Sequence, residues 1–273
     1  MTPGRPRKAG ADPKPGKRRR TLTVAVANQK GGVAKTTTVA SLGVALARLG
    51  VDTLLVDLDP QAALTWSLGL DPEGLDPTVH DVLLGRAGVN EAIRKVEPHL
   101  GLLSSNLDLA GAEPALLART GREYALRSAL DDARTPEGRR WERVLLDCPP
   151  SLGVLTLNAL TAADEVVIPL QPEALSHRGV AQLLDVVADV RRLTNKKLKV
   201  MGVLPTLYDP RVILGREVLA DVTRRYNVKL LEPPVRRSIR FAEAPSRGVS
   251  IFDASPASPG ASAYLVHARR LAT

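Results

Sequence analysis

The sequence predicts an α/β protein whose mostly parallel, twisted β-sheet is covered by helices on both faces. Short apolar runs alternate along the chain with stretches in which apolar residues recur at helical spacing. Most of the short runs are apolar throughout, which is typical of parallel strands buried on both faces. Two of them end in aspartate, and open α/β sheets bind ligands at the carboxyl ends of their strands. We therefore expect one domain over residues 21–273, preceded by a basic tail over residues 1–20.

The individual elements follow from this alternation. The first buried strand is expected at residues 22–27 and the helix after it at residues 39–49. Further strands are predicted at residues 53–59, 101–104, 141–147, 165–170, 199–205 and 229–231. Further helices are predicted at residues 78–84, 89–96, 107–117, 122–133, 155–163, 180–193, 215–226 and 261–271. Aromatic residues make up only 3% of the chain, so the core is expected to consist mostly of Leu, Val and Ala.

The turn between the first strand and its helix has the composition of a phosphate-binding loop. Residues 28–38 read Asn-Gln-Lys-Gly-Gly-Val-Ala-Lys-Thr-Thr-Thr. Gly31 and Gly32 allow backbone N–H groups to turn inward, and the helix N-terminus adds a positive dipole end. Lys35 would then reach the terminal phosphates, and the Thr36 hydroxyl would ligate Mg²⁺. The alternative is a glycine turn that contains lysines without binding phosphate.

This loop departs from the ordinary pattern G-x-x-x-x-G-K-[ST]. Gln29 and Ala34 occupy the two glycine positions, and the form K-G-G-x-[G/A]-K-T-T fits instead. It adds a second lysine, Lys30, five residues before Lys35. A lysine on the entry side of the loop has no strong role in a monomeric site. In a face-to-face dimer, Lys30 would reach the partner's phosphates and supply charge to the transition state.

Carboxylates follow two of the predicted strands. Asp57 and Asp59 end the second strand, and Asp147 ends the strand at residues 141–147. A nucleoside triphosphate site needs a metal and a group that places water. Asp147 suits the metal, directly or through water, while Asp57 and Asp59 offer a further metal-associated acid and a water-positioning group. Each acid has a structural alternative as a strand-end cap or surface charge, most of all Asp57.

Composition excludes several classes of protein. No run of 18 or more apolar residues is present, so no transmembrane helix is expected. The basic N-terminus has no apolar stretch behind it and therefore does not resemble a secretory signal. The single cysteine, Cys148, excludes an internal disulfide and a multi-cysteine metal site within one chain. We expect a cytoplasmic protein.

The formal net charge of +9 is concentrated at the N-terminus. Residues 1–20 hold eight basic residues and one acidic residue, which leaves +2 for the rest of the chain. This Pro- and Gly-containing tail lacks periodicity and is expected to be disordered. It would either bind nucleic acid through phosphate neutralisation or serve only as a solvated tail.

With these residues in view, the chain resembles the ParA/Soj family of chromosome- and plasmid-partition ATPases, a deviant Walker A group that also includes MinD and the nitrogenase iron protein. The resemblance extends from about residue 21 to residue 272. The segments that carry it are residues 28–37, 55–61, 109–113, 147–153, 157–162 and 243–246.

The resemblance implies an ATP- and Mg²⁺-dependent sandwich homodimer that binds double-stranded DNA without sequence specificity. It also implies slow hydrolysis stimulated by a ParB-type centromere-binding partner, a nucleoid-associated location, and no membrane partner. The catalytic residues implied are Lys30, Lys35 and Asp59, with Asp59 positioning the attacking water. The nucleotide-binding residues implied are Lys30, Gly31, Gly32, Val33, Ala34, Lys35, Thr36, Thr37, Asp57, Asn158, Arg236 and Arg237. The metal ligands implied are Thr36 and Asp147, and the DNA contacts are Arg211 and Arg240, for which the alternative is a solvated surface charge.

The sequence also departs from the family pattern. Ala34 replaces the commoner glycine, Arg236 stands where proline is usual, and Arg178 stands where an acidic residue is common. The tail is too short for the helix-turn-helix domain of long plasmid forms, so operator binding is not expected. Two alternatives stay open: a MinD-like membrane-cycling ATPase that positions cell division, and a DNA-binding scaffold that no longer hydrolyses ATP. The short final helix at residues 261–271 argues against the first, and Lys30 with Asp59 argues against the second.

Overall fold

A seven-stranded sheet forms the centre of the molecule in the computed structural model, which describes residues 20–173 and 176–273. The strand order is β3-β4-β2-β5-β1-β6-β7, and all neighbouring pairs are parallel except β3 with β4. The strands are β1 Leu22–Val26, β2 Thr53–Asp57, β3 Ile93–Glu97, β4 Leu100–Leu103, β5 Arg143–Asp147, β6 Glu165–Leu170 and β7 Lys199–Pro205. The predicted mostly parallel α/β fold is therefore confirmed.

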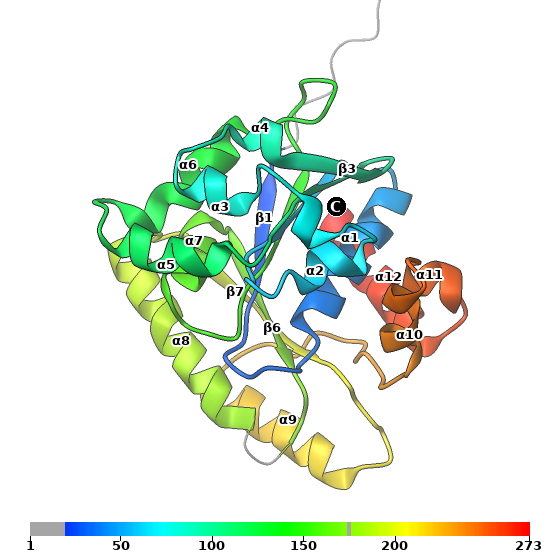
Figure 1. Cartoon of the computed structure of the whole chain (residues 1–273). Coiled ribbons are helices and arrows are strands. Elements are labelled where there is room, and N and C mark those ends of the chain that lie inside the picture. The colour runs from blue at the N-terminus through cyan, green and yellow to red at the C-terminus, as the bar shows by residue number, and fades with distance from the viewer. Residues whose placement is uncertain (1–19, 174–175) are drawn as a thin grey trace, which may run out of the picture.

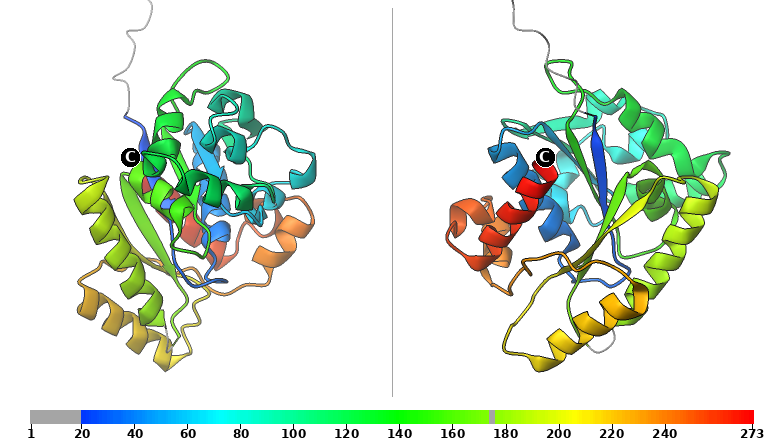
Figure 2. Two further views of the ribbon diagram at one scale, coloured as in Figure 1. Left: turned by 60° about the vertical axis from the view of Figure 1, so that its left-hand side comes forward. Right: turned by 180° about the vertical axis from the view of Figure 1, so that it is seen from behind.

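Helices cover both faces of this sheet (Figures 1 and 2). The α-helices are α1 Lys35–Arg48, α2 Ala63–Ser67, α3 Val79–Leu83, α4 Val89–Ala92, α5 Leu109–Leu117, α6 Ala125–Asp132, α7 Val154–Ala162, α8 Ser176–Leu193, α9 Ile213–Tyr226, α10 Arg240–Ser246, α11 Ile251–Ala254 and α12 Pro259–Ala272. Two short 3-10 helices are η1 Pro72–Gly74 and η2 Arg122–Tyr124. Among the described residues, no helix is long and apolar enough to cross a lipid bilayer.

The core consists of one apolar layer on each face of the sheet. Alternate residues of β1 point to opposite layers, because successive side chains of a strand face opposite sides. Val24 and Val26 belong to the layer under α1 and α12, whereas Ala25 belongs to the layer under α3 to α9. This explains why the interior positions of the parallel strands are mostly apolar on both faces.

Three neighbouring strands deliver the polar groups to one edge. In the register of the sheet, Val26 of β1 lies beside Asp147 of β5, and Asp147 lies beside Asp57 of β2. The loop from β1 to α1 begins at the same edge. Parallel pairing therefore gathers the phosphate-binding loop and the acidic strand ends at the carboxyl edge of the sheet, as predicted.

Some predicted elements differ from the structure. Residues 93–96, predicted within a helix at 89–96, form most of strand β3, and only Val89–Ala92 is helical. The apolar spacing of this segment suits a helix, but its backbone pairs with the free edge of β4 instead. The predicted strand at 229–231 contributes only an isolated bridge between Leu230 and Val203. Helices α2, α10 and α11 were not predicted.

Candidate functional site

The loop between β1 and α1 has the backbone of an anion nest. Gly32 and Ala34 both have left-handed backbones, with φ of 72° and 64°. A left-handed alanine costs about 1 kcal/mol, so the surrounding structure must hold it in place. No heavy atom lies within 4 Å of where a Cβ would stand on Gly31 or Gly32. Gly31 and Gly32 are therefore exposed with free space beside them, which leaves room for an anion next to the loop.

Buried polar contacts fix this loop on both sides. The Asn28 amide donates to the Pro169 carbonyl at 2.7 Å, and its oxygen accepts from the Lys30 N–H at 3.0 Å. On the other side, the Thr206 hydroxyl donates to the Val33 carbonyl at 2.9 Å. Strands β6 and β7 thus position the loop, which reduces the ordering cost of binding a ligand there.

Lys35 and Asp147 form the charged floor of the site. The Lys35 side chain is 7% exposed, and its ammonium donates to the Lys30 carbonyl at 3.2 Å, so it curls back over the loop. Burial lowers the pKa of Lys35, while the nearby charge of Asp147 acts to raise it. Both groups lie where a phosphate and its metal would be held.

The carboxylate of Asp147 is buried without a hydrogen-bond partner among residues 20–173 and 176–273. Both its oxygens are buried, and neither has a hydrogen-bond partner of normal geometry within the described residues. Burial, and then the charge of Asp57, raise the pKa of Asp147 well above its usual value, against the opposing effects of the Thr36 hydroxyl and Lys35. An unpartnered buried carboxylate is costly and calls for an explanation such as an absent ion. The residues present therefore fit a divalent cation between Asp147 and Thr36.

Asp57 and Asp59 have different roles in the structure. Asp57 is fully buried and accepts hydrogen bonds from the backbone and hydroxyl of Thr65 and from the Asp59 N–H, at 2.8 to 3.1 Å. Burial raises the pKa of Asp57 to about 6. These contacts make Asp57 an anchor for the turn from β2 to α2. Asp59 is only partly buried, one of its oxygens accepts from the Gln61 N–H at 3.0 Å, and its charge reaches Lys35.

Lys30 lies outside the nest. Its side chain is 38% exposed, and its ammonium forms an ion pair with Glu173 at 2.5 Å. Glu173 comes three residues after β6, at the same edge of the sheet. The two loop lysines therefore face different environments: Lys35 faces Asp147 and the interior, and Lys30 faces the surface.

The four predicted arginines lie on two segments at this edge. Arg236 pairs with Tyr208 in a parallel bridge, which brings Arg236 and Arg237 alongside the turn that carries Arg211. The Arg211 side chain is 88% exposed and pairs with Asp209 at 2.7 Å, which lowers the pKa of that carboxyl to about 2. Arg240 begins α10 and pairs with Glu243 at 2.7 Å. All four arginines are exposed.

Asn158 is not brought to the loop. Its side chain is fully buried, its oxygen accepts from the Leu126 N–H, and its amide donates to the carbonyls of Arg122 and Val154. The amide thus joins α7 to the segment of η2 and α6. The expectation that Asn158 lies near the nucleotide at a dimer face is not supported, because its polar atoms are already occupied inside the fold.

Sequence reasoning assigned no role to Asn28, Glu173 or Thr206, which hold Lys30 and the loop in place. The signal was available for Glu173, which follows an apolar strand as the aspartates do. Asn28 and Thr206 carried no such signal, because their partners are backbone carbonyls that are distant in the sequence.

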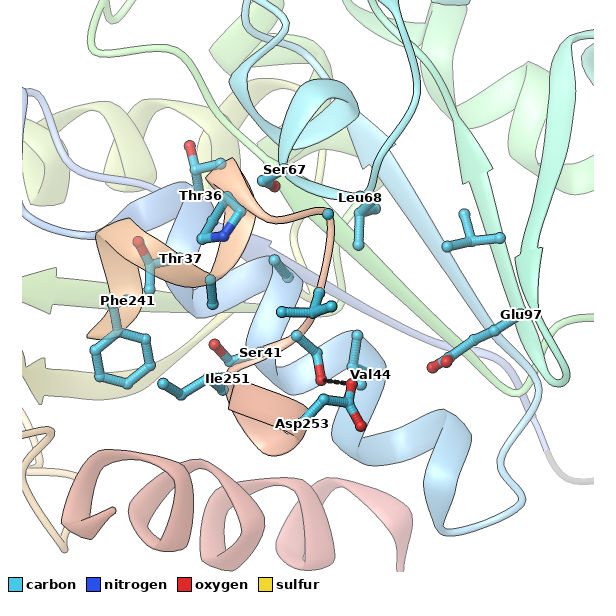
Figure 3. Close-up of a pocket in the computed structure, with 17 residues that line it drawn as sticks. Thr36, Thr37, Ser41, Val44, Ser67, Leu68, Glu97, Phe241, Ile251 and Asp253 are labelled. Carbon is cyan, nitrogen blue, oxygen red and sulfur yellow. Dashed lines mark hydrogen bonds between the residues drawn. The ribbon is translucent and has the colours of Figure 1, made fainter. Parts of the chain in front are cut away.

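A separate pocket lies on the other side of the first turn of α1 (Figure 3). Thr36, Thr37 and Phe241 line one end and Glu97 the other, with Val44 and Leu68 between them. Burial raises the pKa of Glu97. Lys30, Lys35 and Asp147 do not line this pocket, so it is distinct from the loop's concave side.

The fold and the site together define a P-loop nucleotide-binding protein with a lysine-containing, deviant loop. A family model described as an AAA domain matches residues 21–200. Soj from Bacillus subtilis, described as a sporulation initiation inhibitor, is 40% identical over 250 residues, which cover 91% of this chain and 97% of Soj. The chromosome partitioning protein ParA of Caulobacter vibrioides is 42% identical over 251 residues, covering 91% and 92% of the two chains. The chain belongs to the ParA/Soj family.

A solved structure from Mycobacterium smegmatis is 50% identical, with a TM-score of 0.81, covering 92% of this chain and 94% of that chain. It is described as a cobyrinic acid a,c-diamide synthase with a bound ATP analogue and magnesium.

Proposed function

We propose that this protein is a DNA-partition ATPase: with ATP and Mg²⁺ bound it forms a sandwich dimer that holds DNA without sequence specificity, and a ParB-type partner stimulates hydrolysis. The relatives Soj and ParA support the partition role. The ATP analogue, ADP and magnesium described in the Mycobacterium smegmatis structures support the cofactors.

The observation that carries this proposal is the placement of two lysines on one loop. Lys35 is 7% exposed and lies beside Asp147, where a single-subunit site needs its phosphate-binding cation. The Lys30 side chain is 38% exposed and is held by Glu173, whose side chain is 50% exposed. A second cation at the mouth of the nest has a use only if a phosphate approaches from outside, as it does when two subunits face each other.

The donor set fits Mg²⁺ and a nucleoside triphosphate. Thr36 and the unpartnered oxygens of Asp147 are hard oxygen ligands. The backbone N–H groups at Gly31 and Gly32, which have free space beside them, donate hydrogen bonds to phosphate oxygens. When bound, Mg²⁺ neutralises charge on the transferred phosphoryl group. Lys35 leaves the Lys30 carbonyl to meet the phosphates, and Thr37 lies beside them in the first turn of α1. Arg236 and Arg237 provide backbone contacts to the base.

Residues of the carboxyl edge would then carry out two further tasks. Asp59, less buried than Asp57 and within electrostatic reach of Lys35, orients the attacking water. Lys30 leaves Glu173 and stabilises charge at the partner's site. This division leaves Asp57 as the structural anchor of the turn rather than a group that meets the nucleotide.

Arg211 and Arg240 are the proposed DNA contacts. Both are exposed and ion-paired within the chain, to Asp209 and Glu243. Exposed pairs contribute little stability, so phosphates can displace the carboxylates at small cost. Contacts of this kind read the backbone and not the bases.

A second candidate function comes from the Mycobacterium smegmatis description, which names an amide-forming enzyme. Amide synthesis from glutamine commonly uses a cysteine thiolate to release ammonia. The only cysteine here, Cys148, is buried, and burial raises the pKa of its thiol, which keeps it protonated. This observation favours the partition role.

The membrane-cycling alternative requires an available apolar face at the end of the chain. Helix α12 instead packs against α1, with Tyr264, Ala268 and Leu271 buried. The Tyr264 hydroxyl bonds to that of Thr38 at 2.9 Å, which ties the final helix to the phosphate-loop helix.

The proposal is tested by sedimentation velocity and ATP turnover of the full chain. We expect a monomer with ADP, a dimer with a slowly hydrolysed ATP analogue, and turnover that rises with DNA and a ParB-type partner. The Lys30→Ala variant should bind nucleotide and stay monomeric. ATP turnover that depends on an added carboxylic acid and glutamine, and not on DNA, would favour the amide-forming alternative.

A further inference from the structure

A second basic surface lies at the edge of the sheet opposite the phosphate-binding loop. Leu22, Glu165 and Lys199, each the first residue of its strand, line a hollow there. An adjoining hollow shares Arg20 and Lys197 with the first. A five-residue strand such as β1 is about 17 Å long, so at least this distance separates the hollows from the loop. In Figure 1 the C-terminus of the chain lies toward this end, and the loop after β1 lies at the other.

Basic side chains dominate both hollows. We call their exposed basic residues the amino-edge surface, which consists of Arg20, Arg127, Arg140, Arg191, Lys196, Lys197, Lys199 and Arg270. The acidic side chains that line the same hollows are Asp131, Asp164 and Glu165. Positive charge therefore exceeds negative charge by a wide margin over a continuous part of the molecule.

Most of these cations have no carboxylate partner. Arg20 pairs with Asp164 at 2.5 Å, and within residues 20–173 and 176–273 no other member of the amino-edge surface forms a salt bridge. Arg191 and Arg270 donate to the carbonyls of Leu198 and Glu232, which leaves their charge uncompensated. Unpaired cations at this density repel one another, so an anionic ligand would relieve a cost that the free protein carries.

The composition of the surface selects the class of anion. No aromatic side chain lines either hollow, which argues against single-stranded nucleic acid, whose bases stack on such rings. Among the described residues, two large exposed apolar side chains are near this surface in sequence, Leu193 (68% exposed) beside Lys196 and Tyr124 (39% exposed) beside Arg127, whereas insertion into a lipid interface needs a continuous apolar face. Lysines and arginines in a hollowed, non-aromatic surface suit the phosphate backbone of a duplex.

The sequence places more positive charge next to this surface. Arg20 lines both hollows and directly follows residues 1–19, which contain seven further basic residues. Residues 1–19 lie outside the described residues and are joined to the amino-edge surface through Arg20.

We propose that the amino-edge surface is a second binding site for the phosphate backbone of double-stranded DNA, separate from the arginines at the nucleotide edge and independent of the bound nucleotide. Because Arg20 alone among the residues of this surface has a carboxylate partner within the described part of the chain, and no strand end bears the nucleotide there, its affinity is the same with ATP and with ADP. It keeps a released ADP-bound subunit weakly attached to DNA, and in a dimer it adds a contact beyond the nucleotide-controlled face.

The test is fluorescence anisotropy of the full chain on a random-sequence duplex with ADP and Mg²⁺, over a salt series of about 50 to 200 mM. We expect weak, salt-sensitive binding. Lys196→Gln/Lys197→Gln should lower this affinity about 5- to 10-fold and reduce the slope of log affinity against log salt by about 2, because each lost phosphate contact removes about 0.9.

Matched variants separate this site from overall charge and from the proposed switch. Arg86→Gln/Lys95→Gln removes the same charge from exposed positions elsewhere and should change ADP-state binding less than about 2-fold. Arg211→Ala/Arg240→Ala should retain ADP-state binding and lose only the increase that ATP brings. An absent ATP effect alongside an intact amino-edge effect would count against the proposed function and not against this site.

Three results would overturn the proposal. The first is equal weakening by the control pair, which would show that only net charge matters. The second is ADP-state binding that Lys17→Gln/Arg18→Gln/Arg19→Gln abolishes and Lys196→Gln/Lys197→Gln leaves unchanged, which would assign it to the tail. The third is sedimentation with anionic phospholipid vesicles without DNA binding. A second amino-edge pair, Arg140→Gln/Lys199→Gln, checks that the first variant did not act through misfolding.

Discussion

The carboxyl and amino edges of the sheet differ in how their charges are compensated. At the carboxyl edge, each exposed cation of the site forms an ion pair with a carboxylate, namely Arg211, Arg240 and Lys30. The buried carboxylate of Asp147, in contrast, has no hydrogen-bond partner within the described residues. At the amino edge, cations such as Lys196 stay unpaired and exposed. At the carboxyl edge the unpartnered group is a buried carboxyl, whose ionisation a bound metal and nucleotide can change. The amino edge presents a constant charge to solvent. A site that a ligand switches therefore needs buried, coupled charged groups, whereas a site of constant charge does not.

The largest expected effect tests the buried group of the carboxyl edge. Asp147→Asn should lower ATP turnover about 1,000-fold, because the neutral amide cannot replace a carboxylate on the metal that neutralises phosphoryl charge. The measurement is phosphate release under saturating Mg·ATP. Asp189→Asn, the same change on an exposed carboxylate of α8, should leave turnover unchanged. Wild-type turnover in Asp147→Asn would contradict the metal assignment.

The second prediction concerns pH and the same buried pair. A carboxyl whose pKa is raised by folding stabilises the protein below its unfolded pKa of about 4 and loses this contribution as pH rises through the folded value. For Asp57 that value is about 6, and the pKa of Asp147 is raised as well. Between pH 5 and 7 the nucleotide-free protein should therefore lose about 1 kcal/mol of stability from Asp57, and the raised pKa of Asp147 adds to this loss.

Urea unfolding of wild type and Asp147→Asn at several pH values measures this contribution. The difference between the two proteins should grow in favour of the variant as pH rises. Taking the difference removes the opposing contribution of His267, whose pKa is lowered by burial. A difference that is independent of pH would mean that folding does not raise the pKa of Asp147, so that the carboxyl is already ionised in both the folded and the unfolded protein.

The third prediction compares the arginines of the carboxyl edge with basic residues elsewhere. Arg211→Ala/Arg240→Ala should weaken ATP-state DNA binding about 10- to 100-fold at moderate salt, since two phosphate contacts are lost. Arg86→Ala/Lys95→Ala, which removes the same charge from other exposed positions, should have a small effect. If both pairs weaken binding equally, the carboxyl edge has no special role in DNA binding.

The smallest effect tests how the loop is held. A Cβ on Gly179 would stand 2.9 Å from the Asn28 oxygen that accepts the Lys30 N–H. Gly179→Ala should destabilise the protein by about 1 kcal/mol and weaken nucleotide binding. Gly111→Ala in α5, with no atom within 4 Å of the new methyl, should instead stabilise by about 0.5 to 1 kcal/mol, which thermal unfolding can resolve. Equal effects at the two glycines would refute the proposed close approach of α8 to the loop.

Much of the carboxyl edge was predictable from the sequence because its signals are local. The loop at residues 28–38 and the aspartates that end β2 and β5 lie within short motifs, and parallel pairing places them together. The predictions that failed concern residues whose structural partners are distant in the sequence. Strand β3 forms because β4 has a free edge with which it can pair. The Asn158 side chain points into the fold because it forms hydrogen bonds with the backbones of Arg122 and Leu126.

The same distinction applies to charge. The sequence located the arginines at residues 211 and 240, but it did not show that each has a carboxylate partner. It located the basic tail but not the amino-edge surface, because Arg127, Arg140, Lys196 and Arg270 come from separate elements and meet only in the fold.

The most direct test of this account measures the affinity of the full chain for a random-sequence duplex with an ATP analogue, with ADP and without nucleotide, at one fixed salt concentration. We expect strong binding only with the ATP analogue, weak binding that persists in the other two states, and loss of the strong component in Lys30→Ala. Equal affinity in all three states, unchanged by Lys30→Ala, would contradict the claim that the carboxyl edge is the switch.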